Sequence, residues 1–194
     1  MTLRLVSAAL LSALALPALA APVEYTIDPN HSQVEFTYNH FGFSNITGRF
    51  DQIEGKVIFD ADAPAASSAK ATIQIASLDA GVDKLDAHLK SGDFFDAAQF
   101  ATAEFVSTAV EAVGAGKLKM TGDLTIHGVT KPVVFDVTIN QVGDHPMKKI
   151  PAAGFDAQTK IKRSDFGIGL YAPNVSDEIT IEITVEATAK PASA

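Results

Sequence analysis

The sequence predicts an all-β domain of about eight antiparallel strands, with one short helix around residues 80–91. Short segments alternate apolar and polar residues, as the half-buried strands of antiparallel sheets do. Segments rich in glycine and proline separate these strands at regular intervals. The alternation stops once, between residues 79 and 95, where apolar residues follow the spacing of a helix.

The first 20 residues have the features of a cleaved signal peptide. Arg4 precedes an apolar run over residues 5–16, and Ala18-Leu19-Ala20 forms an A-x-A cleavage signature. The run is too short to span a bilayer comfortably. We therefore expect a signal peptide over 1–20, a single domain over 21–189 and a flexible tail over 190–194. Export implies the periplasm or the medium of a bacterium, with a retained N-terminal anchor as the alternative.

The charge and the missing cysteines exclude several classes of function. The chain of 194 residues has a formal net charge of −8, and removal of Arg4 with the signal peptide makes it −9. Phosphate backbones and anionic membranes need a basic surface, so we expect no nucleic-acid partner and no stable membrane insertion. Without cysteine the chain has no disulfide, no thiol nucleophile and no cysteine-bound metal.

The clearest strand pattern lies near the start of the predicted domain, where Val34, Phe36 and Tyr38 share one face. The same alternation runs through residues 71–76, 133–140 and 178–187, and further strands are expected at 50–60, 102–113, 117–126 and 155–162. Strands in this number predict either a sandwich or a closed barrel. The lack of tryptophan and cysteine argues against an immunoglobulin-type sandwich, and closure would remove exposed strand edges.

Turn residues predict how these strands are connected. Gly114 and Gly116 indicate a hairpin between the strands at 102–113 and 117–126. Residues 127–132 link the next pair, with Pro132 expected at a strand start or edge. Residues 143–151 and 61–69 are expected to form looser exposed connections.

The predicted helix has one apolar face. Val82, Leu85 and Leu89 fall at i, i+3 and i+7, with Asp79 expected as the N-terminal cap and Gly92 as the C-terminal stop. A helix this short is not stable alone in water, so its apolar face must lie on another surface. In a barrel, the apolar surface left for it is an open end.

No motif indicates a catalytic or metal site. The five histidines show no tight metal-ligand spacing: His31, His40, His88, His127 and His145. There is no G-x-S-x-G motif to position a serine nucleophile. We therefore expect no enzyme, no metal and no cofactor. The alternative is an enzyme acting on a lipid-linked substrate through polar residues such as His88 and Asp93.

Four stretches resemble the YceI family of bacterial exported proteins. They are "YTIDPNHSQVEFTYNHFGFSNITGRF" (25–50), "LDAHLKSGDFFDAAQF" (85–100), "GDLTIHGVTKPVVFDV" (122–137) and "IKRSDFGIG" (161–169), within a similarity that runs from about residue 23 to 188. The resemblance implies a lipocalin-like antiparallel β-barrel with an associated helix. It also implies binding of a long apolar molecule, of the polyisoprenoid or fatty-amide type, inside the barrel, with no catalytic residue and no metal.

A lipid site inside such a barrel would use the inward side chains of the strands and the helix. The residues expected to line it are Phe36, Tyr38, Phe50, Ile73, Ile75, Leu85, Leu89, Phe94, Phe105, Leu124, Ile126, Phe135, Ile161 and Ile181. The candidates for contact with a lipid headgroup, chosen by their place in family-like motifs, are Arg49, His88, Lys90 and Arg163.

The predicted function is therefore that of a periplasmic carrier or sequestering protein for a long apolar lipid. Burial of a lipid tail is favourable by about 25 cal/mol per Å² of apolar area, and it requires no specific polar contacts. A homodimer remains an open alternative for the oligomeric state. The competing functional hypotheses are the enzyme described above and an interaction protein whose barrel has a fully packed core.

Overall fold

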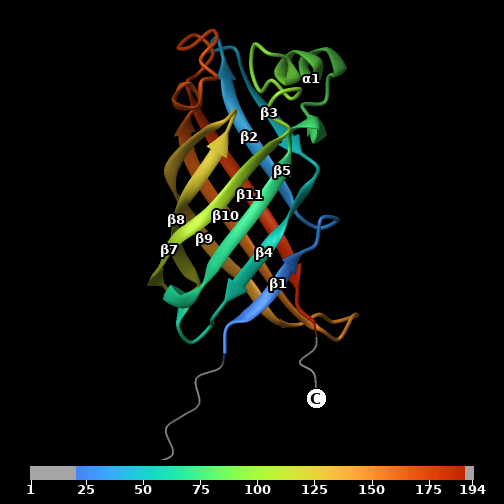
Figure 1. Ribbon diagram of the computed structural model, residues 1–194, viewed down its shortest axis with the longest axis vertical. Coiled ribbons are helices and arrows are strands. Elements are labelled where there is room, and N and C mark those ends of the chain that lie inside the picture. The colour runs from blue at the N-terminus through green and yellow to red at the C-terminus, as the bar shows by residue number, and fades with distance from the viewer. Residues whose placement is uncertain (1–20, 191–194) are drawn as a thin grey trace, which may run out of the picture.

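The computed structural model describes residues 21–190 and shows an elongated β-barrel with one helix at an end (Figure 1). The expected signal peptide and all but Lys190 of the expected tail lie outside the described residues. The elements are β1 (Val23–Ile27), β2 (Gln33–His40), β3 (Ser44–Phe50), β4 (Ile53–Phe59), η1 (Pro64–Ala66), β5 (Ser68–Gln74), η2 (Ile75–Ser77), β6 (Leu78–Asp79), α1 (Asp83–Lys90), β7 (Thr102–Gly114), β8 (Lys117–Ile126), β9 (Val129–Asp144), β10 (Pro151–Lys162), η3 (Arg163–Phe166) and β11 (Glu178–Thr188).

The sheet closes on itself as eight antiparallel strands, as the sequence predicted. The ring runs β1-β4-β5-β7-β8-β9-β10-β11, and β11 returns to β1 at Ile27↔Ala187. Further along, β11 pairs with β2 at Val34↔Ile183, so β1 and β2 are two parts of one interrupted barrel strand. In the same way, β3 and β4 are two parts of the neighbouring barrel strand, because β3 pairs with β2 and β4 pairs with β1. Closure rules out the sandwich alternative.

Three strands, β1, β3 and the two-residue β6, were not predicted from the sequence, and one was misplaced. β1 is only five residues long, and β3 carries polar residues and Gly48, so neither shows a long apolar alternation. The single strand expected over 50–60 is instead the end of β3 and all of β4, separated by residues 51–52. Pro132 lies inside β9, but there β9 pairs only with β8, so its missing N–H faces no second strand.

Helix α1 lies within the predicted range, although its expected end residues were wrong. The N-cap is Val82, because Asp79 belongs to β6 and pairs with Arg49 of β3. The C-cap is Ser91 in an extended conformation, not Gly92. The side chain of Asp86 stabilises the preceding turn, since its Oδ1 accepts a hydrogen bond from the Ala80 N–H at 2.7 Å.

The two ends of the barrel differ. Helix α1, the turn between β2 and β3, and the loop between η3 and β11 gather at one end, which we call the α1 end (Figure 1). The start of β1 and the end of β11 lie at the opposite end (Figure 1). Leu89 of α1 is buried in the core cluster and Leu85 packs partly buried against it, so this part of the apolar face covers barrel surface as expected. Val82, which was predicted on the same face, is instead the N-cap and is 57% exposed.

Candidate functional site: an apolar cavity inside the barrel

A cavity of about 280 Å³ lies inside the barrel and is lined from every barrel strand, mostly by aliphatic and phenylalanine side chains. It includes all fourteen positions at which the sequence predicted a lining residue: Phe36, Tyr38, Phe50, Ile73, Ile75, Leu85, Leu89, Phe94, Phe105, Leu124, Ile126, Phe135, Ile161 and Ile181. Their contact with a lipid stays a prediction. The cavity itself distinguishes this barrel from one with a fully packed core.

The inward positions follow from the strand pleat, because successive side chains of a strand point to opposite faces. On β8, for example, Leu118, Met120, Leu124 and Ile126 line the cavity. Leu118 and Met120 were not predicted, although the same alternation points to them. Phe166, Ile168 and Val175 also line the cavity from irregular segments, for which no sequence periodicity exists.

The polar side chains that line the cavity gather at the α1 end. They come from the end of β2, from α1, and from η3 and its following loop, and they are Tyr38, His40, His88, Arg163 and Tyr171. The rest of the lining is apolar apart from Ser67 and Lys70, on the β4–β5 connection and β5. A bound amphiphile would therefore find its polar partners at the α1 end.

Arg163 lines the cavity but is only 8% exposed, and its side chain donates four hydrogen bonds to backbone carbonyls. Its Nε donates to the carbonyl of Ser176 at 2.9 Å, and its Nη1 donates to those of Ile168 and Leu170 at 2.6 and 2.8 Å. Its Nη2 donates to the carbonyl of Val175 at 2.8 Å. Because a guanidinium has five N–H groups, one remains for a ligand. Arg163 therefore acts first as the anchor of the loop between η3 and β11.

Tyr38 lies near Arg163, and each group affects the pKa of the other. Burial raises the pKa of the Tyr38 hydroxyl, with the Arg163 charge acting in the opposite direction. Burial also lowers the pKa of Arg163, opposed by Asp177 and Tyr38. An arginine remains protonated in proteins, so at neutral pH the pair presents a cation and a neutral phenol. Among residues 21–190 the Tyr38 hydroxyl makes no hydrogen bond, which leaves it free to bind a ligand.

Two of the four headgroup candidates do not line the cavity. Arg49 lies on the outer surface, where its Nε is 2.9 Å from Asp51 Oδ1 and its Nη2 is 3.1 Å from Asp79 Oδ2. Lys90 of α1 is also absent from the lining. Motif position suggested both residues, but motif position does not show which way a side chain points.

The remaining headgroup candidate, His88, lies at the cavity mouth beside the segment that follows α1. Its ring packs edge-on against Phe94 with centroids 4.9 Å apart, and its Nε2 is 3.7 Å from Asp93 Oδ2. Phe94 also contacts Tyr171 of the opposite loop, with ring centroids 6.4 Å apart. Phe95 packs against Phe36 and Phe50 of the barrel wall, at 6.2 and 5.6 Å. The two adjacent phenylalanines thus pack between the wall and the loop at the α1 end.

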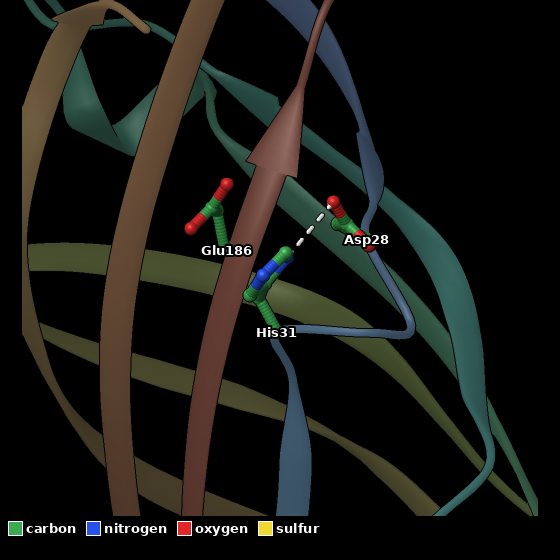
Figure 2. Close-up of side chains that lie close together, drawn as sticks. All are labelled: Asp28, His31 and Glu186. Carbon is green, nitrogen blue, oxygen red and sulfur yellow. Dashed lines mark hydrogen bonds and ion pairs between the residues drawn. The ribbon is translucent and has the colours of Figure 1, made fainter. Parts of the chain in front are cut away.

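A separate charged cluster lies on the outside of the barrel (Figure 2). Donor atoms of Asp28, His31 and Glu186 lie within 4.8 Å of one another, a spacing that a metal ion could use. However, Lys148 Nζ and His31 Nδ1 each lie 3.2 Å from Asp28 Oδ2, and His145 Nε2 lies 3.5 Å from Glu186 Oε1. Because the lysine ammonium would repel a metal ion here, we interpret the cluster as polar contacts, with an ion pair between Lys148 and Asp28, that tie the β9–β10 loop to the wall.

Comparison with known proteins identifies the family. A model of the YceI-like domain matches residues 25–187. The chain belongs to the YceI-like family. A UPF0312 protein of Vibrio cholerae is 36% identical over 188 residues, which cover 96% of this chain and 98% of that protein. A UPF0312 protein of Pseudomonas syringae pv. tomato is 38% identical over 188 residues, covering 96% and 97% of the two chains.

Solved structures of YceI-like proteins share the barrel. BcnA of Burkholderia cenocepacia superposes with a TM-score of 0.76 at 32% identity, over 84% of this chain and 99% of that one. The YceI protein of Campylobacter jejuni gives a TM-score of 0.70 at 35% identity, over 78% and 90% of the two chains. A polyisoprenoid binding domain from Saccharophagus degradans has the same fold, with a TM-score of 0.63 at 15% identity. The Vibrio, Pseudomonas and Campylobacter proteins are named for a family, and the Saccharophagus domain is named for polyisoprenoid binding.

Proposed function

We propose that this YceI-like protein binds one long apolar lipid, of the polyisoprenoid or fatty-amide type, inside its barrel. The observation that carries the proposal is the cavity of about 280 Å³. Its lining is largely apolar, and most of its polar side chains lie at the α1 end. Its volume lies near the lower limit for small-molecule sites, so it suits a single slender chain rather than a bulky ring system. The polyisoprenoid binding domain that shares the fold supports the same ligand class.

The polar end of the lipid would lie at the α1 end of the cavity. Tyr38 offers an O–H donor, Arg163 one remaining N–H and a positive charge, and His88 a ring nitrogen at the mouth. These groups suit a hydrogen-bond acceptor such as a carbonyl or amide oxygen. The tail would extend toward the opposite end along the inner faces of the strands.

A cellular role follows from this binding and from the expected signal peptide at residues 1–20. The protein would carry or sequester the lipid in the bacterial periplasm or the medium, where an aqueous gap separates apolar molecules from their membranes. In the described residues no helix is both long and apolar enough to cross a membrane.

The direct test is organic extraction of the purified protein followed by lipid mass spectrometry. We expect one dominant long-chain lipid per barrel. Ala157 lines the cavity, so an Ala157→Phe variant should lose that lipid. Ala109 is exposed on the outer face of β7, so Ala109→Phe adds the same bulk outside the cavity and should retain it. Wild-type protein free of lipid that also takes up no added isoprenoid would contradict the proposal.

A further inference from the structure

Two loops at the α1 end expose large apolar side chains to solvent. Phe43 is 92% exposed and Phe41 47% exposed at the turn between β2 and β3. Tyr171 is 51% exposed and Leu170 38% exposed in the loop between η3 and β11. We call these four residues the apolar tip. Single exposed apolar residues are ordinary, but a cluster on adjoining loops indicates an interaction site.

The two loops of the apolar tip are joined to each other. The N–H of Phe41 donates to the carbonyl of Asn174 at 3.0 Å, and His40 forms an isolated antiparallel bridge with Val175. The tip is therefore a joined surface rather than two unrelated turns. Its position is also set by the buried Arg163, which fixes the second loop.

The apolar tip is continuous with the cavity. Tyr171 belongs to the tip, yet it also lines the cavity and contacts Phe94 at the mouth. His40, next to Phe41 in the chain, lines the cavity as well. An apolar molecule leaving the cavity beside Tyr171 and His40 would reach the outer apolar surface directly.

The loops of the tip carry a single charged residue, Asp177 at the end of the second loop, although 20% of the chain is charged. No Asp, Glu, Lys or Arg occurs over residues 39–48 or over residues 166–176. A surface that enters the boundary between lipid headgroups and acyl chains should lack charges, because removing a charge from water is costly. Aromatic side chains are favoured at that boundary.

We propose that the apolar tip docks on a lipid bilayer and places the cavity mouth at the acyl-chain boundary, where a lipid can enter or leave. This inference rests on the proposed lipid binding. A second copy of the chain fits the tip less well. A stable interface needs about 800 Å² from each partner. The four side chains of the tip, three of them only about half exposed or less, supply less, at roughly 150–250 Å² for a fully buried aromatic residue.

Docking would depend on apolar insertion and not on charge. The chain is acidic, with a formal net charge of −8, so anionic lipids should repel it. Binding to neutral phosphatidylcholine vesicles should therefore persist at high salt, because salt screens electrostatic attraction but not apolar burial.

The chain contains no tryptophan, so the fluorescence of a single introduced tryptophan reports on the surroundings of that position alone. We would compare Phe43→Trp at the tip with Met147→Trp, since Met147 is 86% exposed in the β9–β10 loop at the opposite end. Both proteins would be produced from the full-length sequence and mixed with phosphatidylcholine vesicles. We expect a blue shift of the emission for Phe43→Trp and none for Met147→Trp. Equal responses, or no response, would overturn the proposal.

A second pair of variants tests affinity by vesicle flotation. Phe43→Ser should bind about tenfold more weakly than wild type, whereas Met147→Ser should bind as wild type does. Both sites are exposed, so neither change should impair folding. If Phe43→Ser instead converts a dimer to a monomer in light scattering and leaves flotation unchanged, the tip is an interface between copies and the proposal is wrong. Binding that disappears at 0.5 M salt, roughly a 4 Å screening length, would also contradict it.

The same preparations separate this proposal from the proposed function. Lipid extracted from a protein that does not bind vesicles would refute membrane docking and leave lipid binding intact. Vesicle binding by a protein that never yields or takes up lipid would refute the cavity function and leave docking intact.

Discussion

The ring of Phe36 on β2 lies against the backbone of Gly48, its register partner on β3. A methyl group at Gly48 would fall 2.4 Å from Cζ of that ring. Gly122 on β8 accommodates Phe105 in the same way, also with 2.4 Å to the ring Cζ. Both phenylalanines line the cavity, so the two glycines let the rings lie on the barrel wall instead of crossing the lumen.

Replacing Gly48 should therefore affect both stability and cavity size. Gly48→Ala must displace the Phe36 ring, and overpacking of this kind costs about 1–3 kcal/mol. We expect a lower free energy of unfolding in urea and less extracted lipid per protein. Gly143→Ala is the matched control in β9, because a methyl group there meets no atom within 4 Å. Equal effects of the two changes would show that the glycine contact does not hold the lumen open.

The role of α1 is tested by adding a charge to either face. Leu89 is buried and lines the cavity, whereas Ala87 is exposed on the same helix. Leu89→Asp should reduce extracted lipid strongly and destabilise the fold by about 2–4 kcal/mol, whereas Ala87→Asp should change either by little. Asp86→Ala is a poorer control, since the Asp86 carboxylate accepts a hydrogen bond from the Ala80 N–H. Equal lipid retention by the Leu89 and Ala87 variants would show that the helix is only a connector.

Arg163 should contribute more to the free energy of unfolding than an exposed arginine does. Arg163→Leu leaves four buried or half-buried carbonyls without their donors, and we expect a loss of about 3–5 kcal/mol. The melting temperature should fall by roughly 10 °C, measured by circular dichroism. Arg49→Leu makes the same change at an exposed pair of salt bridges and should cost about 0–1 kcal/mol. Arg163→Lys should also destabilise, because an ammonium cannot reproduce the planar fork.

The pH dependence of stability should include a contribution from Asp28. Its pKa is held below the ordinary value by the Asn30 backbone N–H first, and then, against the opposing effect of burial, by His31 and Lys148. The folded state thus binds a proton more weakly than the unfolded state. This contribution is complete above the unfolded pKa of about 4, and it is lost as the pH falls from there toward the folded pKa.

Urea unfolding at several pH values measures this contribution. Asp28→Asn should lower the free energy of unfolding by about 1–2 kcal/mol at pH 7, and the gap to wild type should shrink toward about pH 2. Asp123→Asn makes the same charge change at an exposed position and should lie within about 0.5 kcal/mol of wild type. A gap for Asp28→Asn that stays constant with pH would mean that its ionisation is not what stabilises the fold.

Much of the barrel could be predicted from alternation alone. The pleat turns every second side chain inward, so Phe36, Leu124 and Phe135 could be placed on the inner face without knowledge of their neighbours. The helix over 83–90 could be placed for the same reason, since a periodicity is a local property. The missed β1 and β3 are short or glycine-containing, and their pairing depends on long-range partners rather than on pattern.

The polar part of the site was decided by tertiary structure. Arg163 stood in a recognisable motif, but its carbonyl partners come from a loop whose path no periodicity encodes. Arg49 stood in another motif and points away from the cavity toward Asp79, because β3 pairs with β6 there. The sequence by itself determined which faces of the strands are apolar. Closure of the sheet decided that those faces enclose a space, and loop hydrogen bonds decided which polar groups reach its mouth.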